Sequence, residues 1–415
     1  MSENKKTILF LSQIDFKEKS IQVIRKTPEY FVKYGWEVHY VVASDKSKSG
    51  DYYYEKEINP EGVNVYRFSI FFEKLKDKIS NNLLLTVVGK ISLYLMIFQL
   101  FSYGRKILKK QQIDVVYGYE TIGVLAVWLL KLFSFTKKFK TVSRFQGTWI
   151  TQYFKEKKYL KLILNIDKLI ALKVRNNLAI MTDDGTQGDF ALKKLNKKQN
   201  FKFWVNGVDN QFLEKEKYID LKEKYVKNNE TVILSVSRLI SWKRIDRTIE
   251  IVDKIVNQNN CKNFIYLIIG EGPEKESLEK MVKLHNLENY IQFVGSVQNQ
   301  EIKKYLNFAD IFISMYDLSN VGNPLLEAIS ANCCIFTLNN GDTGNWIKHK
   351  ANGFIYEIDD NLFNNVARDI ISYSKDNDLQ KFIKKNVELT NKEKLWNWDE
   401  RMKTEVECVT ELLNT

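Results

Sequence analysis

Short apolar runs alternate with helical patterns along almost the whole chain, and this alternation constrains the fold more than any other feature. The clearest runs lie at residues 7–11, 37–43, 231–236, 264–269 and 311–315. Each run is followed by a loop and then by a segment whose apolar residues recur with the period of a helix. Strands that alternate with helices form a parallel sheet covered by those helices. The sequence therefore predicts an α/β protein.

The composition is that of a soluble globular protein with room for two cores. The chain has 415 residues, of which 44% are hydrophobic and 27% charged. Its four cysteines (261, 333, 334 and 408) form no CxxC pair, and it has only three histidines, so neither a zinc site nor a disulfide framework is indicated. The N-terminus lacks the order of a secretory signal, and we expect a reducing, cytoplasmic location.

Positive charge is concentrated in the first half of the chain. The net charge is +12, but residues 1–200 hold 35 Lys and Arg against 19 Asp and Glu, whereas residues 201–415 hold 28 against 32. Residues 101–200 alone carry 20 basic and 7 acidic residues. This asymmetry favours an anionic membrane surface or an anionic acceptor as the partner of the first half. No helix-turn-helix, RNA-binding or basic-zipper signature is present, so nucleic acid is not the expected partner.

Residues 83–101 form the most apolar window, interrupted only by Lys90, Ser92 and Gln99. The window is long enough to cross a membrane, but it is also suited to a core helix or to a helix that lies in the membrane interface. A lysine near the middle of a span costs about 2.5 to 3.5 kcal/mol, which disfavours the first interpretation. The other two interpretations stay open.

The segment 317–330 is predicted to form a loop that ends on a helix N-terminus. Asn323 is the expected N-cap and Pro324 the first helical residue, so that the amides of Leu325 and Leu326 remain available. Such a helix end favours an anion, above all a phosphate.

Glu327 follows in the first helical turn of that segment. Its carboxylate can accept hydrogen bonds from sugar hydroxyls, or it can simply complement the helix dipole. The local sequence does not separate these two roles.

Residues 323–328, Asn-Pro-Leu-Leu-Glu-Ala, resemble the donor-binding loop of the GT-B glycosyltransferases of family 4. The family pattern has one Glu, seven residues and a second Glu. Glu327 matches the second, which in the family holds the nucleotide ribose. Ser319 stands in place of the first, which usually touches the transferred sugar. The resemblance also implies that Asn320, Gly322 and Asn323 belong to the donor-binding loop.

Two cations follow the run at residues 231–236. Arg238 and Lys243 lie five residues apart, before a helix expected from Arg244. At the carboxyl end of a parallel strand they can grip a diphosphate, although solvated surface charge is the alternative. The segment resembles the family's Gly-Arg-Leu and Lys-Gly sequence, with Ser237 and Arg244 at its glycines.

Gly270, Gly272 and Glu274 follow the run at residues 264–269, with Pro273 as the expected first helical residue. The two glycines alone are a weak phosphate signal, because an ordinary tight turn explains them equally well. The family has Gly-x-Gly-Pro at this point, which implies a donor-binding role.

Four residues of the first half are assigned to the acceptor side. Asp15 lies in a loop that has no glycine and is therefore not a dinucleotide fingerprint. Gln146 and Gly147 end the strand expected from residue 141, and Thr182 ends the one at residues 178–181. Gln146 stands where many family members have a His, and it can hydrogen-bond a substrate but cannot shuttle a proton.

The resemblance implies a GT-B fold with two Rossmann-like domains whose parallel sheets face a central cleft. Residues 1–205, joined by a terminal helix at 396–415, are expected to bind the acceptor. Residues 206–395 are expected to bind the nucleotide-sugar, and the polar stretch 214–230 is expected to connect the domains.

The expected activity is a retaining glycosyl transfer from a nucleotide-sugar to a glycan or lipid-diphosphate-linked acceptor in surface polysaccharide or glycolipid biosynthesis. Arg238 and Lys243 would stabilise the leaving diphosphate, with no metal or cofactor. The protein is expected at the cytoplasmic face of the cell membrane. The alternative is a non-catalytic GT-B protein that binds a nucleotide or glycan, which would explain the missing carboxylate at Ser319.

Overall fold

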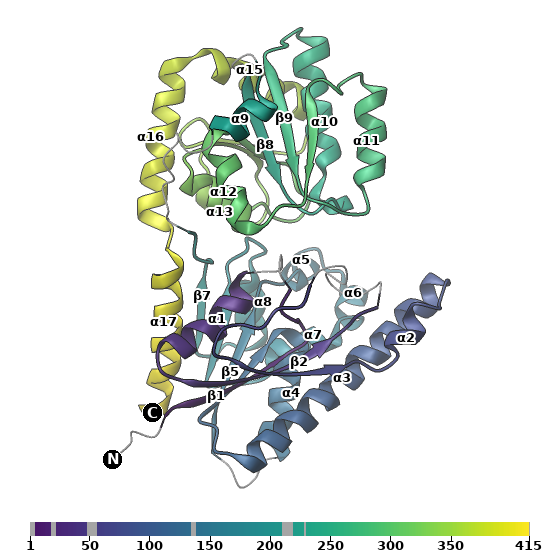
Figure 1. Cartoon of the computed structure of the whole chain (residues 1–415), viewed down its shortest axis with the longest axis vertical. Helices are drawn as coiled ribbons and strands as arrows, with labels where there is room; N and C mark the ends of the chain where they lie inside the picture. Colours follow the sequence, from purple (N-terminus) through teal and green to yellow (C-terminus); the bar gives the residue numbers. More distant parts are fainter. Residues whose placement is uncertain are drawn as a thin grey trace. The chain divides into compact units, whose positions relative to one another are not determined.

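A computed structural model describes residues 5–17, 22–47, 56–133, 138–209, 219–227 and 230–414, and its strands form two parallel sheets (Figure 1). The chain divides into two compact units. The first comprises Met1–Asp183, Gln187–Trp204 and Asp399–Thr415, and the second comprises Asp184–Thr186 and Val205–Trp398. The predicted α/β class with parallel sheets is confirmed.

The first unit contains a seven-stranded sheet in the order β3-β2-β1-β4-β5-β6-β7. Its strands are β1 (Thr7–Ser12), β2 (Glu37–Ser44), β3 (Asn64–Ser69), β4 (Val115–Tyr119), β5 (Lys140–Phe145), β6 (Leu178–Thr182) and β7 (Phe201–Trp204). Its helices are α1 (Gln22–Lys33), α2 (Glu73–Lys76), α3 (Asn82–Lys110), α4 (Glu120–Phe133), α5 (Ile150–Lys155), α6 (Tyr159–Ile163), α7 (Ile166–Lys173), α8 (Gly188–Leu195) and α17 (Trp398–Glu411).

The long helix α3 is only partly packed. Its C-terminal half buries Met96, Ile97 and Leu100 against the sheet and α4, whereas much of its N-terminal half is exposed. Within the described part of the chain, α3 alone is long and apolar enough to cross a membrane, and 22% of its most apolar window is buried. It is therefore a core helix at one end and a surface helix at the other.

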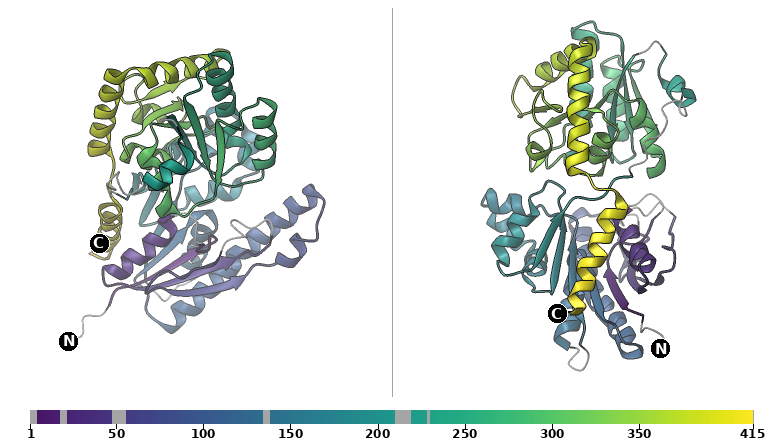
Figure 2. Two further views of the ribbon diagram at one scale, coloured as in Figure 1. Left: turned by 45° about the horizontal axis from the view of Figure 1, so that its top comes forward. Right: turned by 90° about the vertical axis from the view of Figure 1, so that its left-hand side faces the viewer.

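A buried ionic cluster attaches α17 to the sheet of the first unit, along which the helix runs (Figure 2). Glu405 accepts a 2.6 Å hydrogen bond from the Tyr117 hydroxyl, and its other carboxylate oxygen lies 2.9 Å from Arg401 and 3.9 Å from Arg144. All four side chains are fully buried. Although burial opposes ionisation, the two guanidinium groups hold the pKa of Glu405 below its usual value.

The second unit contains a six-stranded sheet in the order β10-β9-β8-β11-β12-β13. Its strands are β8 (Thr231–Val236), β9 (Phe264–Ile269), β10 (Ile291–Gly295), β11 (Ile311–Ser314), β12 (Cys334–Leu338) and β13 (Phe354–Tyr356). Its α-helices are α9 (Ile219–Tyr225), α10 (Ile245–Asp253), α11 (Lys275–Leu284), α12 (Asn299–Phe308), α13 (Asn323–Ser330), α14 (Thr343–Trp346), α15 (Leu362–Lys375) and α16 (Asn377–Lys394).

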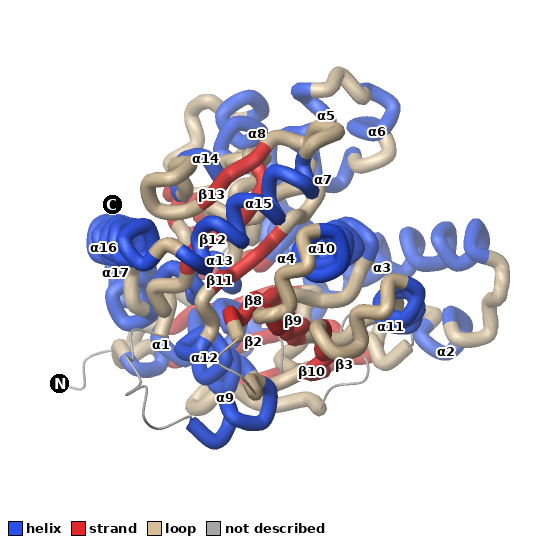
Figure 3. Tube along the Cα trace, turned by 90° about the horizontal axis from the view of Figure 1, so that it is seen from above, coloured by secondary structure: helices blue, strands red, loops and turns tan. Residues whose placement is uncertain are grey.

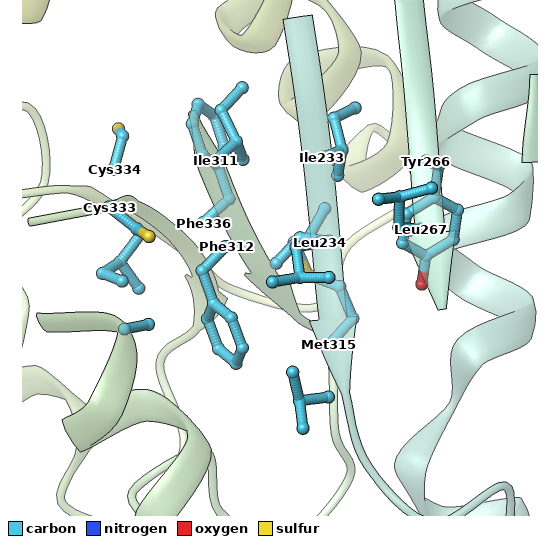
Figure 4. Close-up of a cluster of buried hydrophobic side chains, with 14 of the residues drawn as sticks. Ile233, Leu234, Tyr266, Leu267, Ile311, Phe312, Met315, Cys333, Cys334 and Phe336 are labelled. Atoms are coloured by element: carbon cyan, nitrogen blue, oxygen red, sulfur yellow. The ribbon is translucent and has the colours of Figure 1, made fainter. Parts of the chain in front are cut away.

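Helices cover both faces of this second sheet, as parallel connections require. Figure 3 shows α10, α11 and α15 on one side of the strands and α12, α13 and α16 on the other. The strands are buried on both faces, and Figure 4 shows Leu234, Ile311, Phe312 and Phe336 among the side chains that fill the core. The sheet is thus a rigid base for the loops at its carboxyl edge.

Two parts of the chain differ from the sequence-based expectation. The proposed connection at residues 214–230 begins outside the described residues, and its later part forms α9. The helix expected from Pro273 begins only at Lys275, because residues 273–274 form a turn in which the Glu274 amide donates to the Leu239 carbonyl.

The ionic cluster predicts an unequal response of α17 to the loss of its glutamates. Glu405→Ala removes the carboxylate that pairs with two buried guanidinium groups and is expected to reduce the free energy of unfolding by about 3 to 5 kcal/mol. Glu407→Ala on the same helix removes only an exposed pair with Lys403 at 3.8 Å and is expected to change it by less than about 0.5 kcal/mol. Urea unfolding of both variants tests this, and equal midpoints would contradict it.

Candidate functional site

Two loops touch backbone to backbone at the carboxyl edge of the second sheet. The Leu239 amide donates to the Glu271 carbonyl at 2.9 Å, and a Cβ on Gly270 or Gly272 would lie 1.8 Å from the Ser237 oxygen or 2.3 Å from the Leu239 oxygen. Gly270 also has a φ of +143°, which favours glycine. The two glycines are therefore needed for loop contact, a function that the sequence did not reveal.

This contact fixes the loop that carries Arg238 and Lys243. The ammonium of Lys243 lies 3.7 Å from the centre of the Tyr316 ring and 4.0 Å from that of Trp242. Burial, followed by the charge of Arg238, lowers the pKa of Lys243 to about 7, while the Asp184 carboxylate acts in the opposite direction. The structure thus brings the two predicted cations together, and it adds an aromatic enclosure that was not foreseen.

Asp317 joins this loop to the one after β11. Its amide donates to the Trp242 carbonyl at 3.0 Å, and its carboxylate lies 3.3 Å from Arg244 and 2.8 Å from Arg247. Arg244, at a φ of 48°, precedes α10, which begins one residue later than expected. The loop that carries Arg238 and Lys243, which we call the cationic loop, is therefore fixed by the loop after β9 and by the loop after β11.

Ser319 and Asn320, at the centre of the predicted donor loop, form hydrogen bonds to other protein groups that fix the conformation of this loop. Ser319 is buried, and its hydroxyl donates to the Asp184 carbonyl at 2.8 Å and accepts from the Val321 amide. Asn320 is also buried, accepts from the Tyr316 amide and donates to the Asn340 side chain. Both side chains shape the loop in this structure.

The start of α13 is one residue earlier than predicted. Gly322, in extended backbone, is the N-cap, and the expected cap Asn323 is already helical because its side chain instead accepts a 2.9 Å hydrogen bond from Asn206. The Leu326 amide donates to the Gly322 carbonyl at 3.1 Å. The prediction that this amide stays available for an anion was therefore wrong.

Glu327 lines a cavity of about 530 Å³ between α12, α13 and α16. Burial, reinforced by the neighbouring Asp209 carboxylate, raises its pKa to about 8, so a half-buried Glu327 carries a proton near neutral pH. The cavity is also lined by Lys303, Lys381 and Lys384. Neither Arg238 nor Lys243 is among its lining residues.

The four acceptor-side residues lie at or beyond the carboxyl ends of strands β1, β5 and β6 of the first sheet. Asp15 lies beyond the end of β1 and is buried against Arg67, whose Nε lies 2.9 and 3.0 Å from its oxygens. Gln146 and Gly147 follow β5, and the Gln146 side chain donates to the Tyr119 hydroxyl. Thr182 ends β6 with a buried hydroxyl that has no partner among the described residues. All four lie at one edge of the sheet.

Glu120 belongs to the same edge and was missed by the sequence analysis. It follows β4 with a φ of 59°, an uncommon conformation for a non-glycine residue, and accepts a 2.7 Å hydrogen bond from the Gln146 amide. Burial raises its pKa to about 7. The only sequence signal was its place directly after a buried strand.

One group of potential metal ligands lies elsewhere in the described part of the second unit. Glu250, Asp253 and His285 place ligand atoms within 4.8 Å of one another. The His285 ring lies 3.6 Å from Glu250 and 3.2 Å from Asp253, so pairing of an imidazole with carboxylates accounts for the group. None of the three belongs to the cationic loop.

Comparison with known proteins addresses the second unit most directly. Residues 216–390 match the family model "Glycosyl transferases group 1". The second unit carries a group 1 glycosyltransferase domain.

The chain is also similar to a curated relative. The chain is 25% identical over 173 residues to the alpha-monoglucosyldiacylglycerol synthase of Acholeplasma laidlawii, a match that covers 41% of this chain and 42% of the relative. The match therefore spans less than half of that protein.

Solved structures show that the fold is GT-B across both units. Sucrose-phosphate synthase from Thermosynechococcus elongatus superposes with a TM-score of 0.75 at 14% identity, over 99% of this chain and 100% of that one. Anabaena Alr3699/HepE, solved with UDP and glucose, gives 0.70 at 14% identity over 98% and 100%. The predicted fold is confirmed.

The environment of Lys243 predicts that the protein takes up a proton when it binds a diphosphate. A bound anion raises the Lys243 pKa from about 7, so affinity is highest below pH 7 and falls by up to about tenfold per pH unit above it. Calorimetry with a nucleoside diphosphate at pH 8, in two buffers of different ionisation enthalpy, should show uptake approaching one proton. Lys243→Gln should abolish the uptake; unchanged uptake in this variant would assign the proton to another group.

Proposed function

We propose that the chain is a retaining family 4 glycosyltransferase that moves a sugar from a nucleotide-sugar to a glycan or lipid-diphosphate-linked acceptor in surface polysaccharide or glycolipid biosynthesis. The observation that carries the proposal is Lys243 beside Arg238 at the carboxyl edge of the group 1 domain. Open parallel sheets bind ligands at this edge. The name of the A. laidlawii relative, a glycolipid synthase, supports the acceptor class.

In this proposal the reaction needs positioning and charge stabilisation rather than a protein nucleophile. The bond between the sugar carbon and the diphosphate breaks, the acceptor oxygen bonds to that carbon on the same face, and the departing diphosphate takes the hydroxyl proton. Arg238 and Lys243 stabilise the charge that develops on the diphosphate. These two cations supply what a metal ion would otherwise supply, and the proposal includes no metal.

The remaining donor contacts are assigned to residues of the second unit by their resemblance to the family pattern. Glu327 is proposed to hold the ribose, while Gly270, Gly272 and Glu274 position the loop beside the diphosphate. The cavity at Glu327 and the cationic loop would bind two parts of one nucleotide-sugar, since both lie in the second unit.

The acceptor is assigned to the first unit. Asp15, Gln146, Gly147 and Thr182 are proposed to contact it, and Glu120 adds a carboxyl group whose pKa of about 7 suits hydrogen bonding to a hydroxyl. The excess of basic residues in the first half supports an anionic, lipid-diphosphate-linked acceptor at the cytoplasmic face of an anionic membrane.

Ser319 favours a second candidate, a GT-B protein that binds a nucleotide or glycan without transfer. Its hydroxyl is engaged within the loop, and no carboxylate stands at this position. Release of nucleoside diphosphate from a panel of nucleotide-sugars, with and without acceptor lipid extract, separates the two. An enzyme releases it with at least one donor, and a binding protein does not.

Loss of either cation is expected to reduce turnover far more than stability. Arg238→Ala and Lys243→Ala each remove a charge-assisted contact that strengthens in the transition state, which corresponds to about 2 kcal/mol or more, or roughly thirtyfold in kcat/KM. Lys280→Ala is the matched control, because this exposed lysine lies on α11 and forms a 2.6 Å ion pair with Glu276 on the same helix. Wild-type turnover by both loop variants would remove the pair from the site.

The two residues of the paired-Glu pattern are expected to respond differently. Glu327→Gln should weaken nucleoside diphosphate binding more at pH 9 than at pH 6, because the wild-type side chain ionises only above its pKa of about 8 and then accepts two ribose hydroxyls. The loss at pH 9 should be about 1.5 to 3 kcal/mol.

Ser319→Ala should leave that affinity unchanged at both pH values, because its hydroxyl bonds to the protein backbone. Calorimetry measures both variants. An unaltered affinity in Glu327→Gln at pH 9 would mean that the ribose binds elsewhere.

A further inference from the structure

An exposed apolar stripe runs along the N-terminal half of α3. Its residues recur at three- and four-residue intervals, so they share one face of the helix. They are Leu84, Val87, Ile91, Tyr94 and Phe98, of which Leu84 is 52% and Phe98 61% exposed. At 1.5 Å per residue the stripe is about 21 Å long. Soluble proteins rarely expose so much contiguous apolar surface without a partner.

A second set of exposed apolar residues continues the stripe in the same unit. It comprises Tyr159, Leu160, Ile163, Leu164 and Ile166, on α6 and at the start of α7. The Lys90 ammonium, on α3, donates a 3.2 Å hydrogen bond to the Leu164 carbonyl, which joins the two sets. Helices α3 and α7 also pack against the same helix, α4. We refer to the two sets together as the apolar face.

Basic residues surround the apolar face. Residues 149–175 contain seven Lys and Arg against two Asp and Glu, and residues 70–110 contain eight against two. The lysines nearest in sequence to the exposed leucines, Lys90, Lys157, Lys158 and Lys161, are themselves exposed. An apolar centre within a basic margin is complementary to a bilayer whose headgroups are anionic.

From this arrangement we propose that the apolar face docks the first unit on an anionic lipid surface, with the leucine and isoleucine side chains inserted at the level of the headgroups. This surface is distinct from the donor site, and it specifies the membrane contact that the proposed function requires. A second copy of the chain fits less well, because two such faces would oppose like charges.

A transmembrane position of α3 does not fit the packing of its other face. Ser92 donates a 2.7 Å hydrogen bond to the Phe71 carbonyl and Gln99 a 3.1 Å bond to the Ser69 carbonyl. Met96, Ile97 and Leu100 are buried against the unit. A span would break all of these contacts, whereas docking uses only the side chains that are already exposed.

The test is co-sedimentation of the full chain with vesicles of equal parts phosphatidylglycerol and phosphatidylcholine. One variant combines Leu84→Gln, Val87→Gln and Ile91→Gln, and another combines Leu160→Gln and Ile163→Gln. Glutamine retains helix propensity, and the positions are exposed, so unchanged circular dichroism and melting temperature are expected. The matched control combines Leu284→Gln and Leu389→Gln, which remove exposed leucines from the second unit.

We expect each face variant to lose at least tenfold in vesicle partitioning, the control to match the wild type, and neutral phosphatidylcholine vesicles to bind less well. Wild-type partitioning by both face variants would overturn the proposal, as would equal wild-type binding to neutral vesicles. A wild-type dimer that becomes monomeric in the face variants would assign the face to a second copy instead.

Release of nucleoside diphosphate without lipid is measured in parallel. The face variants should retain it, because no residue of the face belongs to the donor site. If the wild type does not bind vesicles but still releases nucleoside diphosphate, the docking proposal fails and the proposed sugar transfer stands. If the wild type releases no nucleoside diphosphate, the proposed transfer fails whatever the result with vesicles.

Discussion

Direct contact between two loop backbones at the carboxyl edge of the second sheet is the constraint on which the donor site depends. Gly270 and Gly272 permit it, because any side chain there would overlap the Ser237 or Leu239 carbonyl oxygen. The contact fixes the path of the chain from β8 to α10, and Asp317 fixes the other side of the same loop. Arg238 and Lys243 are therefore presented by a braced loop, which reduces the ordering cost of binding an anion.

Burial and like charge oppose the ionisation of Lys243 at this edge. Burial and then the charge of Arg238 disfavour the ammonium form of Lys243, whereas the Tyr316 and Trp242 rings, which lie 3.7 and 4.0 Å from it, attract a cation. A bound anion would favour the charged form. Glu327 shows the opposite case, since an enclosed carboxyl beside Asp209 retains its proton. Two ionisable groups of one unit are thus shifted toward neutrality near physiological pH, as is common at functional sites.

The sequence predicted the strands well because strands buried on both faces are continuous apolar runs. The run at residues 264–269 coincides with β9, and the run at residues 231–236 coincides with β8. The edge strand β3 was missed, since its exposure alternates and its sequence is mixed. The helix starts near Pro273 and Asn323 were displaced by two residues and one, because tertiary hydrogen bonds from Glu274 and Asn206 override local capping preference.

The candidate site was predictable only where a residue type carries its own chemistry. Arg238 and Lys243 were found as cations after a strand, but the ring of Tyr316 beside Lys243 comes from the loop after β11 and has no local signal. Glu120 was missed because its φ and its contact with the Gln146 amide exist only in the folded chain. The role of the two glycines likewise depends on a loop some thirty residues away in sequence.

The most direct test of the account is a crystal structure of the protein with a bound nucleoside diphosphate. The account predicts that the phosphates contact Arg238 and Lys243 at the carboxyl edge of the second sheet, with the ribose hydroxyls against Glu327. Phosphates bound instead among Lys303, Lys381 and Lys384, with the cationic loop vacant, would contradict it.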